Sequence, residues 1–496
     1  MRKHLAYAVA AGLTCVVPAA LTAARPIEAS EVGAVVDDFR KFRSTADAKK
    51  ALKRLDALRK RGGTPDLIAR VEALRGIVLT VLQHFPDADS AFAVAALGQP
   101  AESFSLVSQF DISSTFGNVG GVRRALGRLI DAFPDIARAL PGEKLYPAIR
   151  AVREVDGEAA DTLIVKLAEI GWGEDRISSR DAMALSAVKV ELKRKNPDTA
   201  SQLSRRIIDR ASLVELLTYR RYESLWPSTE ARVGDRMEQP TREVVLNAEQ
   251  RLKEQPDSDG ARHELLIAYR HAGRLPDAER VGADFAKTGE AIDVLTEEGG
   301  WVVNDHAMVL LRLGRDADSD ARFTSLRRIP IAQAPWLINM IINRAEFLTR
   351  TKRNAEAWAL IGEAEELSKT YGSPYGRQLV RRMKACVAYR DKRAEAPELA
   401  QAFVDNAKDA QGATVEGLMC LDRADQAARD AIALLGDEDK RDSIIDSLLP
   451  DDDTRADPSG WGAAQLLERA DVRTAFDKVA RVLPARFVVP KGGVSP

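Results

Sequence analysis

Apolar residues recur every three or four positions along most of this 496-residue chain, which is the spacing of an α-helix that buries one face. Between 36 and 60 the apolar side chains are Phe39, Phe42, Ala51, Leu52, Leu55 and Leu58. The pattern stops at the polar, Gly- and Pro-containing stretch 61–65 and resumes over 66–85. The sequence therefore predicts two helices joined by a short turn, which together form a helical hairpin.

The same spacing continues along the chain, and short breaks separate the helical stretches at Pro134, Pro141-Gly142, Asp156-Gly157, Gly171-Trp172-Gly173 and Asn196-Pro197-Asp198. Val, Ile, Thr and Tyr do not gather into the alternating segments that form strands. Ala, Leu, Arg and Glu recur instead, and these residues are compatible with helix. We therefore predict an all-α fold in which helical hairpins stack into a superhelical solenoid.

The stretch 99–121 has no helical period. It places Phe104, Phe110 and Phe116 among Ser, Thr, Asn and Gly residues, so we predict a long loop there. Such a loop is either an insertion packed on the array or a functional loop, and the sequence leaves both readings open. Its glycine-rich end lacks the Gly-Lys-Ser/Thr that closes a phosphate-binding loop, so we assign it no nucleotide.

A polar segment at 226–240, interrupted by Pro227, Gly234 and Pro240, predicts a boundary between two helical regions. Near the C-terminus, an amphipathic stretch follows an acidic run and predicts one more helix that caps the array. The predicted parts after residue 24 are an N-terminal helical-hairpin region at 30–226, a solenoid at 241–449, a capping helix at 459–483 and a flexible tail at 484–496.

Five hairpin turns in the second half align with one another. In each, an apolar helix end is followed by one small or polar residue and then by an arginine: Arg274, Arg315, Arg353, Arg393 and Arg423. These arginines recur at roughly 30–40-residue spacings, the range of helical-hairpin repeats. Stacking should align them along one edge, where guanidinium groups can hold carboxylates or carbonyls of an extended partner. The alternative is that each arginine pairs with a nearby Asp or Glu.

The first of these hairpins resembles the tetratricopeptide repeat. Pro256 ends the preceding repeat, Tyr269 lies late in the first helix, Gly273 makes the turn and Ala278 lies early in the second helix, as in that family's pattern. A later hairpin matches the family's small-residue positions at Ala345, Leu348, Ala357 and Ala364. Small residues allow two crossing helices to approach closely.

Two departures make the resemblance a degenerate one. Leu266 stands where the family usually has Gly or Ala, and Gly282 stands where it usually has an aromatic residue. The readable resemblance covers 241–449, and it implies an α-solenoid that binds extended ligands along its concave surface. We take Tyr269, Arg274, Arg315, Arg353 and Arg393 as candidate binding residues.

The first 24 residues have the features of a secretory signal peptide. A basic start precedes an apolar stretch from Leu5 to Ala23, and small residues end it, with cleavage expected after Ala24 or, as the alternative, after Ala29. A retained membrane anchor and a lipid on Cys15 are the other readings. We expect an exported protein, periplasmic or secreted, with no stable membrane insertion after cleavage.

Removal of the signal leaves two cysteines, Cys386 and Cys420. Two cysteines are too few for a disulfide-built scaffold, and no Cys/His cluster suggests a metal site. Neighbouring helix axes lie roughly 8–10 Å apart, whereas a disulfide needs Cα atoms within about 7 Å. We therefore expect the two thiols to be free.

Charge and composition narrow the range of partners. The formal net charge is −1, and acidic and basic residues are interleaved, so no strong positive field exists to attract nucleic acid. We expect His263 and His271 to be solvated helix residues. The run Asn304-Asp305-His306 offers a base beside an acid, but no nucleophile motif completes a catalytic set. We assign no catalytic residue, no cofactor and no metal ligand.

Aromatic side chains leave two readings open. Trp301, Trp336 and Trp358 either fill hairpin cores or line a groove for peptide or glycan. The cluster 219–222, Tyr-Arg-Arg-Tyr, is either a solvated helix face or a basic-aromatic surface. Our hypothesis is an exported non-enzymatic helical-repeat scaffold that binds a protein or an extended peptide. The alternatives are an envelope polysaccharide accessory protein that uses the same concave surface, and an enzyme with a site near 99–121.

Overall fold

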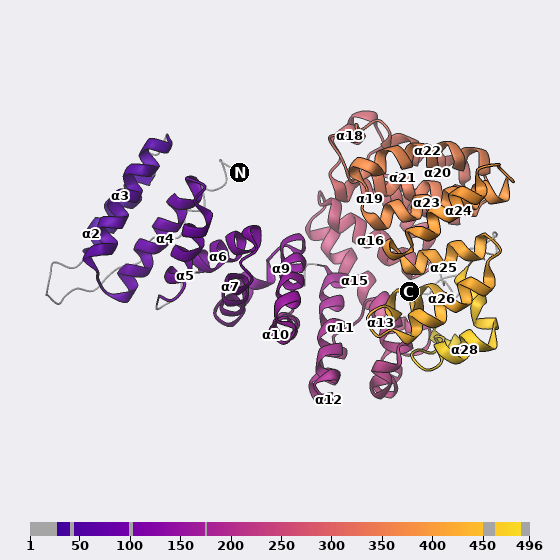
Figure 1. Cartoon of the computed structure of the whole chain (residues 1–496), viewed down its shortest axis with the longest axis horizontal. Coiled ribbons are helices and arrows are strands. Elements are labelled where there is room, and N and C mark those ends of the chain that lie inside the picture. Colours follow the sequence, from indigo (N-terminus) through magenta and orange to yellow (C-terminus); the bar gives the residue numbers. More distant parts are fainter. Residues whose placement is uncertain (1–26, 40–43, 99–102, 174–175, 450–461, 488–496) are drawn as a thin grey trace. The chain divides into compact units, whose positions relative to one another are not determined.

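The computed structural model of the chain describes residues 27–39, 44–98, 103–173, 176–449 and 462–487 (Figure 1). All the named elements in these ranges are helices, and an isolated bridge between Tyr219 and Ala480 is the one place where two extended residues pair. The predicted all-α fold is therefore confirmed. None of the helices in these ranges has the length and apolar character needed to span a bilayer. The predicted signal peptide lies outside the described residues.

The chain divides into two compact units, Met1–Arg206 and Ile207–Pro496. This division lies before the segment 226–240, where the sequence suggested a boundary. That segment belongs to the second unit, where it forms the end-to-end helices α14 (Trp226–Val233), η2 (Asp235–Met237) and α15 (Glu238–Glu254).

The first unit is a run of helical hairpins. Its helices are α2 (Ala29–Phe39), α3 (Thr45–Arg61), α4 (Pro65–Val81), α5 (Phe85–Ala95), α6 (Ser103–Phe116), α7 (Val119–Ala132), α8 (Pro134–Arg138), α9 (Gly142–Val155), α10 (Gly157–Glu169), α11 (Ile177–Lys193) and α12 (Pro197–Ser204). The predicted stop at 61–65 is confirmed. Arg61 ends α3, and Thr64 caps α4 with its side chain before Pro65 at the first helical position.

The predicted loop at 99–121 is wrong for the residues that the structure describes. Residues 103–116 form α6, and 117–118 make the tight turn into α7. The periodicity is hidden because polar side chains face the protein interior. Ser113 and Asn118 both donate hydrogen bonds to the carboxylate of Asp89 on α5. Polar residues that find such partners can be buried in a helix, and a pattern based on hydrophobicity alone cannot detect them.

The second unit continues the hairpins. Its remaining helices are α13 (Arg210–Thr218), η1 (Arg220–Leu225), α16 (Asp259–His271), α17 (Leu275–Ala283), α18 (Gly289–Asp293), α19 (Glu297–Arg312), α20 (Asp316–Leu326), α21 (Leu337–Arg350), α22 (Asn354–Tyr371), α23 (Pro374–Arg390), α24 (Ala396–Asp405), η3 (Ala407–Asp409), α25 (Gln411–Cys420), α26 (Ala424–Gly436), α27 (Arg441–Leu448), η4 (Ala463–Glu468), α28 (Ala470–Phe476) and η5 (Ala485–Phe487).

Five hairpins of this unit pair a first helix with a second: α16 with α17, α19 with α20, α21 with α22, α23 with α24 and α25 with α26. Successive first helices also pack on one another, whereas successive second helices do not pack closely. Elements on the inside of a curved stack lie closer together than those on the outside. The first helices therefore line the inner side of the curve, and α27 continues their row.

The second unit closes on itself. Its helices α13, η1 and α14, which precede the five hairpins above and which we call the first hairpin, contact its C-terminal segment. Tyr219 and Tyr222 are each 1% exposed. The hydroxyl of Tyr219 donates to Asp446 on α27 at 2.7 Å, and Arg221 pairs with Asp442. The predicted solvated face at 219–222 is therefore wrong, and so is a basic-aromatic surface. The cluster is a buried seam between sequence-distant ends, which no local pattern reveals.

The C-terminal prediction is also corrected. Instead of one helix over 459–483, the described residues form the short η4 and α28, and a turn and a non-helical segment follow. These elements pack against α26 and α27, so they cover the last hairpin. The predicted flexible tail is wrong for its first residues, 484–487, since η5 is placed there and Phe487 is 1% exposed. Residues 488–496 lie outside the described residues.

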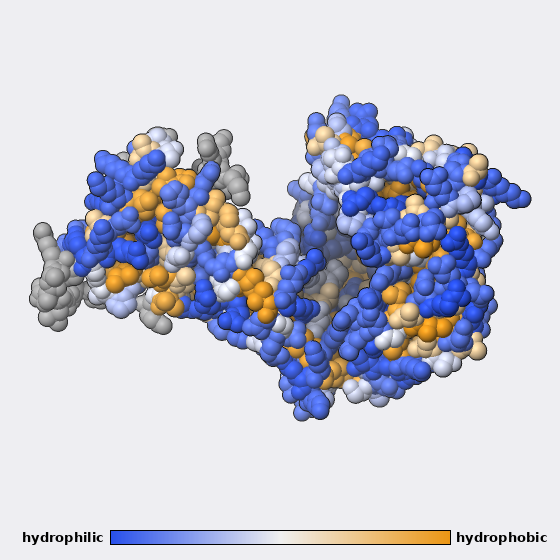
Figure 2. All heavy atoms as spheres, viewed as in Figure 1, coloured by the Kyte–Doolittle hydropathy of each residue, from blue (hydrophilic) through white to orange (hydrophobic). Residues whose placement is uncertain are grey.

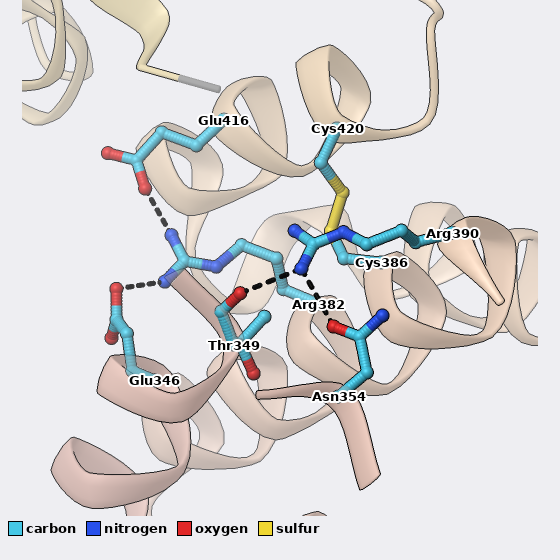
Figure 3. The surroundings of a disulfide bond; sticks show 8 residues. All are labelled: Glu346, Thr349, Asn354, Arg382, Cys386, Arg390, Glu416 and Cys420. Carbon is cyan, nitrogen blue, oxygen red and sulfur yellow. Dashed lines mark hydrogen bonds and ion pairs between the residues drawn. A yellow bond between two sulfur atoms is a disulfide. The ribbon is translucent and has the colours of Figure 1, made fainter. Parts of the chain in front are cut away.

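A disulfide joins Cys386 on α23 to Cys420 on α25, so the prediction of free thiols is wrong (Figure 3). The spacing of two helix axes is larger than the distance between Cα atoms that face each other across them. A Cα atom lies about 2.3 Å from its helix axis, so residues that face each other come closer than the axes do. Here the two Cα atoms are 5.8 Å apart, within the range that a disulfide spans.

Candidate functional site

The five predicted turn arginines occupy one equivalent backbone position. Each follows a residue with positive φ: Gly273, Gly314, Lys352, Lys392 and Asp422. Each arginine amide then donates to the carbonyl oxygen five residues earlier, at 2.8 Å for Arg274 and 2.9 Å for the other four. This is the Schellman arrangement that ends a helix. The second helix of each hairpin begins directly after the arginine or shortly beyond it.

Three of these arginines pair with an acidic residue early in the helix that follows. The Nε atoms of Arg274, Arg315 and Arg353 donate to Asp277, Asp318 and Glu356 at 2.6, 2.7 and 2.8 Å. These bonds lower the pKa of Asp277 and Glu356 despite the opposing effect of burial. Arg393 pairs with the nearby Asp391 at 3.2 Å. The pairing with nearby acids, which was the alternative reading, is thus present at four of the five positions.

The same arginines also connect successive hairpins. Arg315 pairs with Glu279 at 2.9 Å, and Arg353 pairs with Asp320 at 2.6 Å. Arg393 instead lies over the ring of Trp358, 3.9 Å from its centroid. Glu279, Asp320 and Trp358 occupy the same position in their own hairpins, so the contacts form a regular row. We call this row, from Arg274 to Arg423, the turn edge.

The turn edge remains accessible. The side chains of Arg274, Arg353 and Arg315 are 26%, 27% and 47% exposed, and a guanidinium has five N–H donors, so some donors remain for a ligand. Arg423 differs from the other four, because its side chain forms no hydrogen bond or ion pair with any described residue. Arg423 as a whole is half-buried at the last turn.

Tyr269 does not lie on an open inner surface. Its ring packs in the core of α15, α16 and α17, and its hydroxyl donates to Glu249 at 2.6 Å. Arg274 covers the ring at 4.5 Å from the centroid. Burial, together with the acceptor Glu249, raises the pKa of Tyr269 to about 12. The structure therefore brings Tyr269 and Arg274 together, but at a seam between helices.

The inner helices carry charged pairs that sequence reasoning missed. His263 on α16 bonds to Asp305 on α19 at 2.7 Å and faces Glu298 at 3.5 Å. Arg270 pairs with the other oxygen of Asp305 at 2.8 Å. Burial alone would lower the pKa of His263, but its bonds to the two carboxylates raise it to about 9. The expectation of a solvated His263 is thus wrong.

The spacing of these residues was a usable signal. His263 and Arg270 lie seven positions apart on one predicted helix, and Glu298 and Asp305 do so on the next, which places each pair on a single face. The expectation of a solvated His271 is also wrong. Burial lowers the pKa of His271 to about 3, and Arg270 adds to the effect.

His306 does not form an acid–base pair with the adjacent Asp305, which bonds to His263 instead. Neither ring nitrogen of His306 has a hydrogen-bond partner among the residues that the structure describes, and burial lowers its pKa to about 4. The ring packs on Gly282, where an added Cβ would lie 2.4 Å from Cγ of His306. His306 therefore fills the space left by the missing aromatic residue of the repeat pattern.

A second charged group crosses three inner helices (Figure 3). Arg382 on α23 reaches Glu346 on α21 at 2.6 Å and also pairs with Glu416 on α25. Burial alone would raise the pKa of Glu346, but Arg382 and Arg350 outweigh it and lower the pKa to about 2. Arg390 donates to the Thr349 carbonyl at 3.0 Å. The inner face is therefore occupied by internal ion pairs along much of its length.

The three tryptophans named from the sequence lie against hydrophobic cores. Trp301 and Trp336 are partly buried against one core, and Trp358 is partly buried against the next, which supports the reading of core aromatics. Figure 2 shows a viewed surface that is mostly hydrophilic, with hydrophobic residues in scattered patches. No group of three or more metal-ligating side chains occurs within the described ranges.

No family model and no curated protein matches the sequence. Among solved structures, the chain is similar to one in the crystal structure of the APC/C hetero-tetramer Cut9-Hcn1, with a TM-score of 0.29 and 11% identity over 81% of this chain and 80% of that chain. It is also similar to one in the structure of Naa15/Naa10 bound to HypK-THB, with a TM-score of 0.25 and 12% identity over 90% and 68%.

Likenesses this distant carry no argument of their own, so the assignment of the fold rests on the helix pairing described above. The five turns share one backbone conformation, the small residues Ala278, Ala345, Ala357 and Ala364 are buried, and first helices stack on first helices. The described residues form an all-α stack of helical hairpins, and the turns and buried small residues of the second unit resemble those of the tetratricopeptide repeat.

Proposed function

We propose that this chain is an exported helical-repeat scaffold that binds a protein or an extended peptide, and that it is not an enzyme. The observation that carries the proposal is the turn edge, where side chains of one type recur at one position of successive hairpins. Such a regular row suits a ligand whose own groups repeat along an extended backbone. Its arginines favour carboxylates and backbone carbonyls as the groups that they recognise.

Two observations support the proposed export. The first 24 residues have the order of basic, apolar and small residues of a signal peptide. The two cysteines that remain after its removal are bonded to each other, and disulfides persist mainly in oxidising compartments. We place the protein in the periplasm or outside the cell.

A polysaccharide partner gains no support, because the three tryptophans that would stack on sugars pack against cores.

Arg423 provides the cleanest test of the turn edge. Since its side chain has no partner among the described residues, Arg423→Glu should not disturb the fold. Arg429 lies in the next helix, α26, and is exposed, so Arg429→Glu makes the same charge change away from the edge. The assay is capture of exported proteins by the purified chain, followed by quantitative mass spectrometry.

We expect at least one protein to be retained by the wild-type chain and by Arg429→Glu, and to be lost from Arg423→Glu. Adding Arg274→Glu and Arg353→Glu to Arg423→Glu should lower the retention of that protein further. If all variants retain the same proteins equally, the turn edge is not the binding surface. If the wild-type chain retains nothing above an unrelated helical protein, the scaffold proposal fails.

A further inference from the structure

The C-terminal segment 477–487, which we call the strap, is held against the first hairpin of the second unit by contacts typical of a bound peptide. After α28 ends at Phe476, the strap makes a turn over 477–479, pairs with residues 218–220 through the bridge at Ala480, and ends in η5. Arg220 donates its amide to the Val479 carbonyl at 2.9 Å, and Arg481 donates its amide to the Thr218 carbonyl at 2.8 Å. Backbone bonds of this kind provide affinity without demanding a particular sequence.

Arg481 supplies the sequence-dependent contacts. Its Nε donates to the Leu217 carbonyl at 2.7 Å, and its terminal nitrogen donates to Glu230 at 2.6 Å. The guanidinium lies over Trp226, 3.7 Å from the ring centroid. A carbonyl, a carboxylate and an indole face thus surround one arginine, and together they meet its hydrogen-bonding, charge and stacking preferences.

A second arginine uses the same carboxylate. Arg486 pairs with the other oxygen of Glu230, and the neighbouring Phe487 is buried. Glu230 is itself only 19% exposed. Two arginines of the strap therefore converge on one largely buried acid, which is anchored on α14 beside Trp226.

We propose that this surface, formed by the carbonyls of 217 and 218, Trp226 and Glu230, is a recognition site for an extended peptide that carries two arginines in the spacing of Arg481 and Arg486. In the isolated chain the strap occupies the site as an intramolecular competitor. The inference deepens the proposed function, on which it rests, by giving the chemistry of one partner segment. It adds a site on the first hairpin that is separate from the turn edge.

The strap controls access to the site because it belongs to the same chain. A segment of the same chain competes at an effective concentration in about the millimolar range, so a free peptide of micromolar affinity hardly displaces it. Weakening the contacts of the strap should make the site accessible to a free peptide. The probe is a fluorescent peptide with the sequence of 477–487, and its binding to the full chain is followed by fluorescence anisotropy.

Three full-length chains distinguish the outcomes: the wild type, Arg481→Glu/Arg486→Glu, and that double variant with Glu230→Arg added. We expect the double variant to bind the peptide at least about tenfold more tightly than the wild type, and the triple variant to lose binding. A fourth full-length chain, Glu230→Arg alone, repels its own strap, so a peptide with both arginines changed to Glu should bind it through exchanged charges.

Three results would overturn the proposal. The double variant keeps its helical circular dichroism but does not bind the peptide, or it binds no more tightly than the wild type. Alternatively, light scattering shows that the wild type is a dimer that dissociates in the double variant, which would make a second copy the occupant. If the glutamate variant unfolds, Arg481→Ala/Arg486→Ala is judged by the same criteria. Capture through Arg423 does not depend on this site, so the two proposals can fail separately.

Discussion

His263 shows how a single side chain can make the stability of the second unit depend on pH. The carboxylates of Asp305 and Glu298 hold its pKa at about 9, whereas an unfolded chain releases this proton near pH 6.5. The folded state therefore binds a proton that the unfolded state has lost between these values. The stabilisation is complete below about pH 6.5 and disappears as the pH rises through 9.

We predict that His263→Gln removes this contribution. The wild type should be more stable than the variant by on the order of 2 kcal/mol at pH 6, and the difference should vanish by about pH 9.5. Asp305 stays paired with Arg270 in both chains, so the comparison isolates the histidine. Thermal unfolding measured in steps from pH 6 to 9.5 tests it. A constant difference across this range would contradict the assigned ion pair.

Arg382 is the corresponding case of a buried charge with two acidic partners. Its side chain is 9% exposed and lies between Glu346 and Glu416. We predict that Arg382→Met lowers the free energy of unfolding by about 3–5 kcal/mol, because it leaves Glu416 without its cation and Glu346 with Arg350 alone. Changing both partners as well, in Arg382→Met/Glu346→Gln/Glu416→Gln, should recover much of the loss. Urea denaturation measures both, and a single variant as stable as the wild type would refute the prediction.

At the scale of elements, the sequence pattern predicted the hairpin turns but could not predict the buried polar contacts. The recurrence of Arg274, Arg315, Arg353, Arg393 and Arg423 located five helix ends, because a helix end is set by local backbone chemistry. The helix α6 escaped detection because its polar residues bond to Asp89. The seam at Tyr219 and the strap escaped for a similar reason, since their partners lie more than two hundred residues away.

The disulfide joins two elements, α23 and α25, which otherwise meet through a small core. We predict that the denatured, unreduced mature chain contains no free thiol. We also predict that Cys386→Ala/Cys420→Ala loses about 3–4 kcal/mol of stability, the loop-closure value for a bridge of this length. Thiol titration and urea denaturation test the two statements. Two free thiols per chain would show that the bridge is absent in solution.

At the scale of the molecule, each of the two units is compact by itself and has its own hydrophobic core clusters. We predict that residues 207–496, produced alone, fold with a helical circular dichroism spectrum and a cooperative thermal transition. Removing the strap from this fragment should lower the midpoint, because α14 loses the partners of Trp226 and Glu230. A fragment without a cooperative transition would show that the second unit depends on the first.

The closure of the second unit also has a topological consequence. When the first hairpin and the C-terminal segment are in contact, the place where the chain begins is not fixed by the packing. Joining the two ends with a flexible linker and cutting at an exposed turn, such as Lys352, would give a circular permutant with the same stack of hairpins. An open solenoid has two unlike end repeats, so its chain could not be circularly permuted in this way. In this unit, the order of the helices along the chain can therefore change while their arrangement in space stays the same.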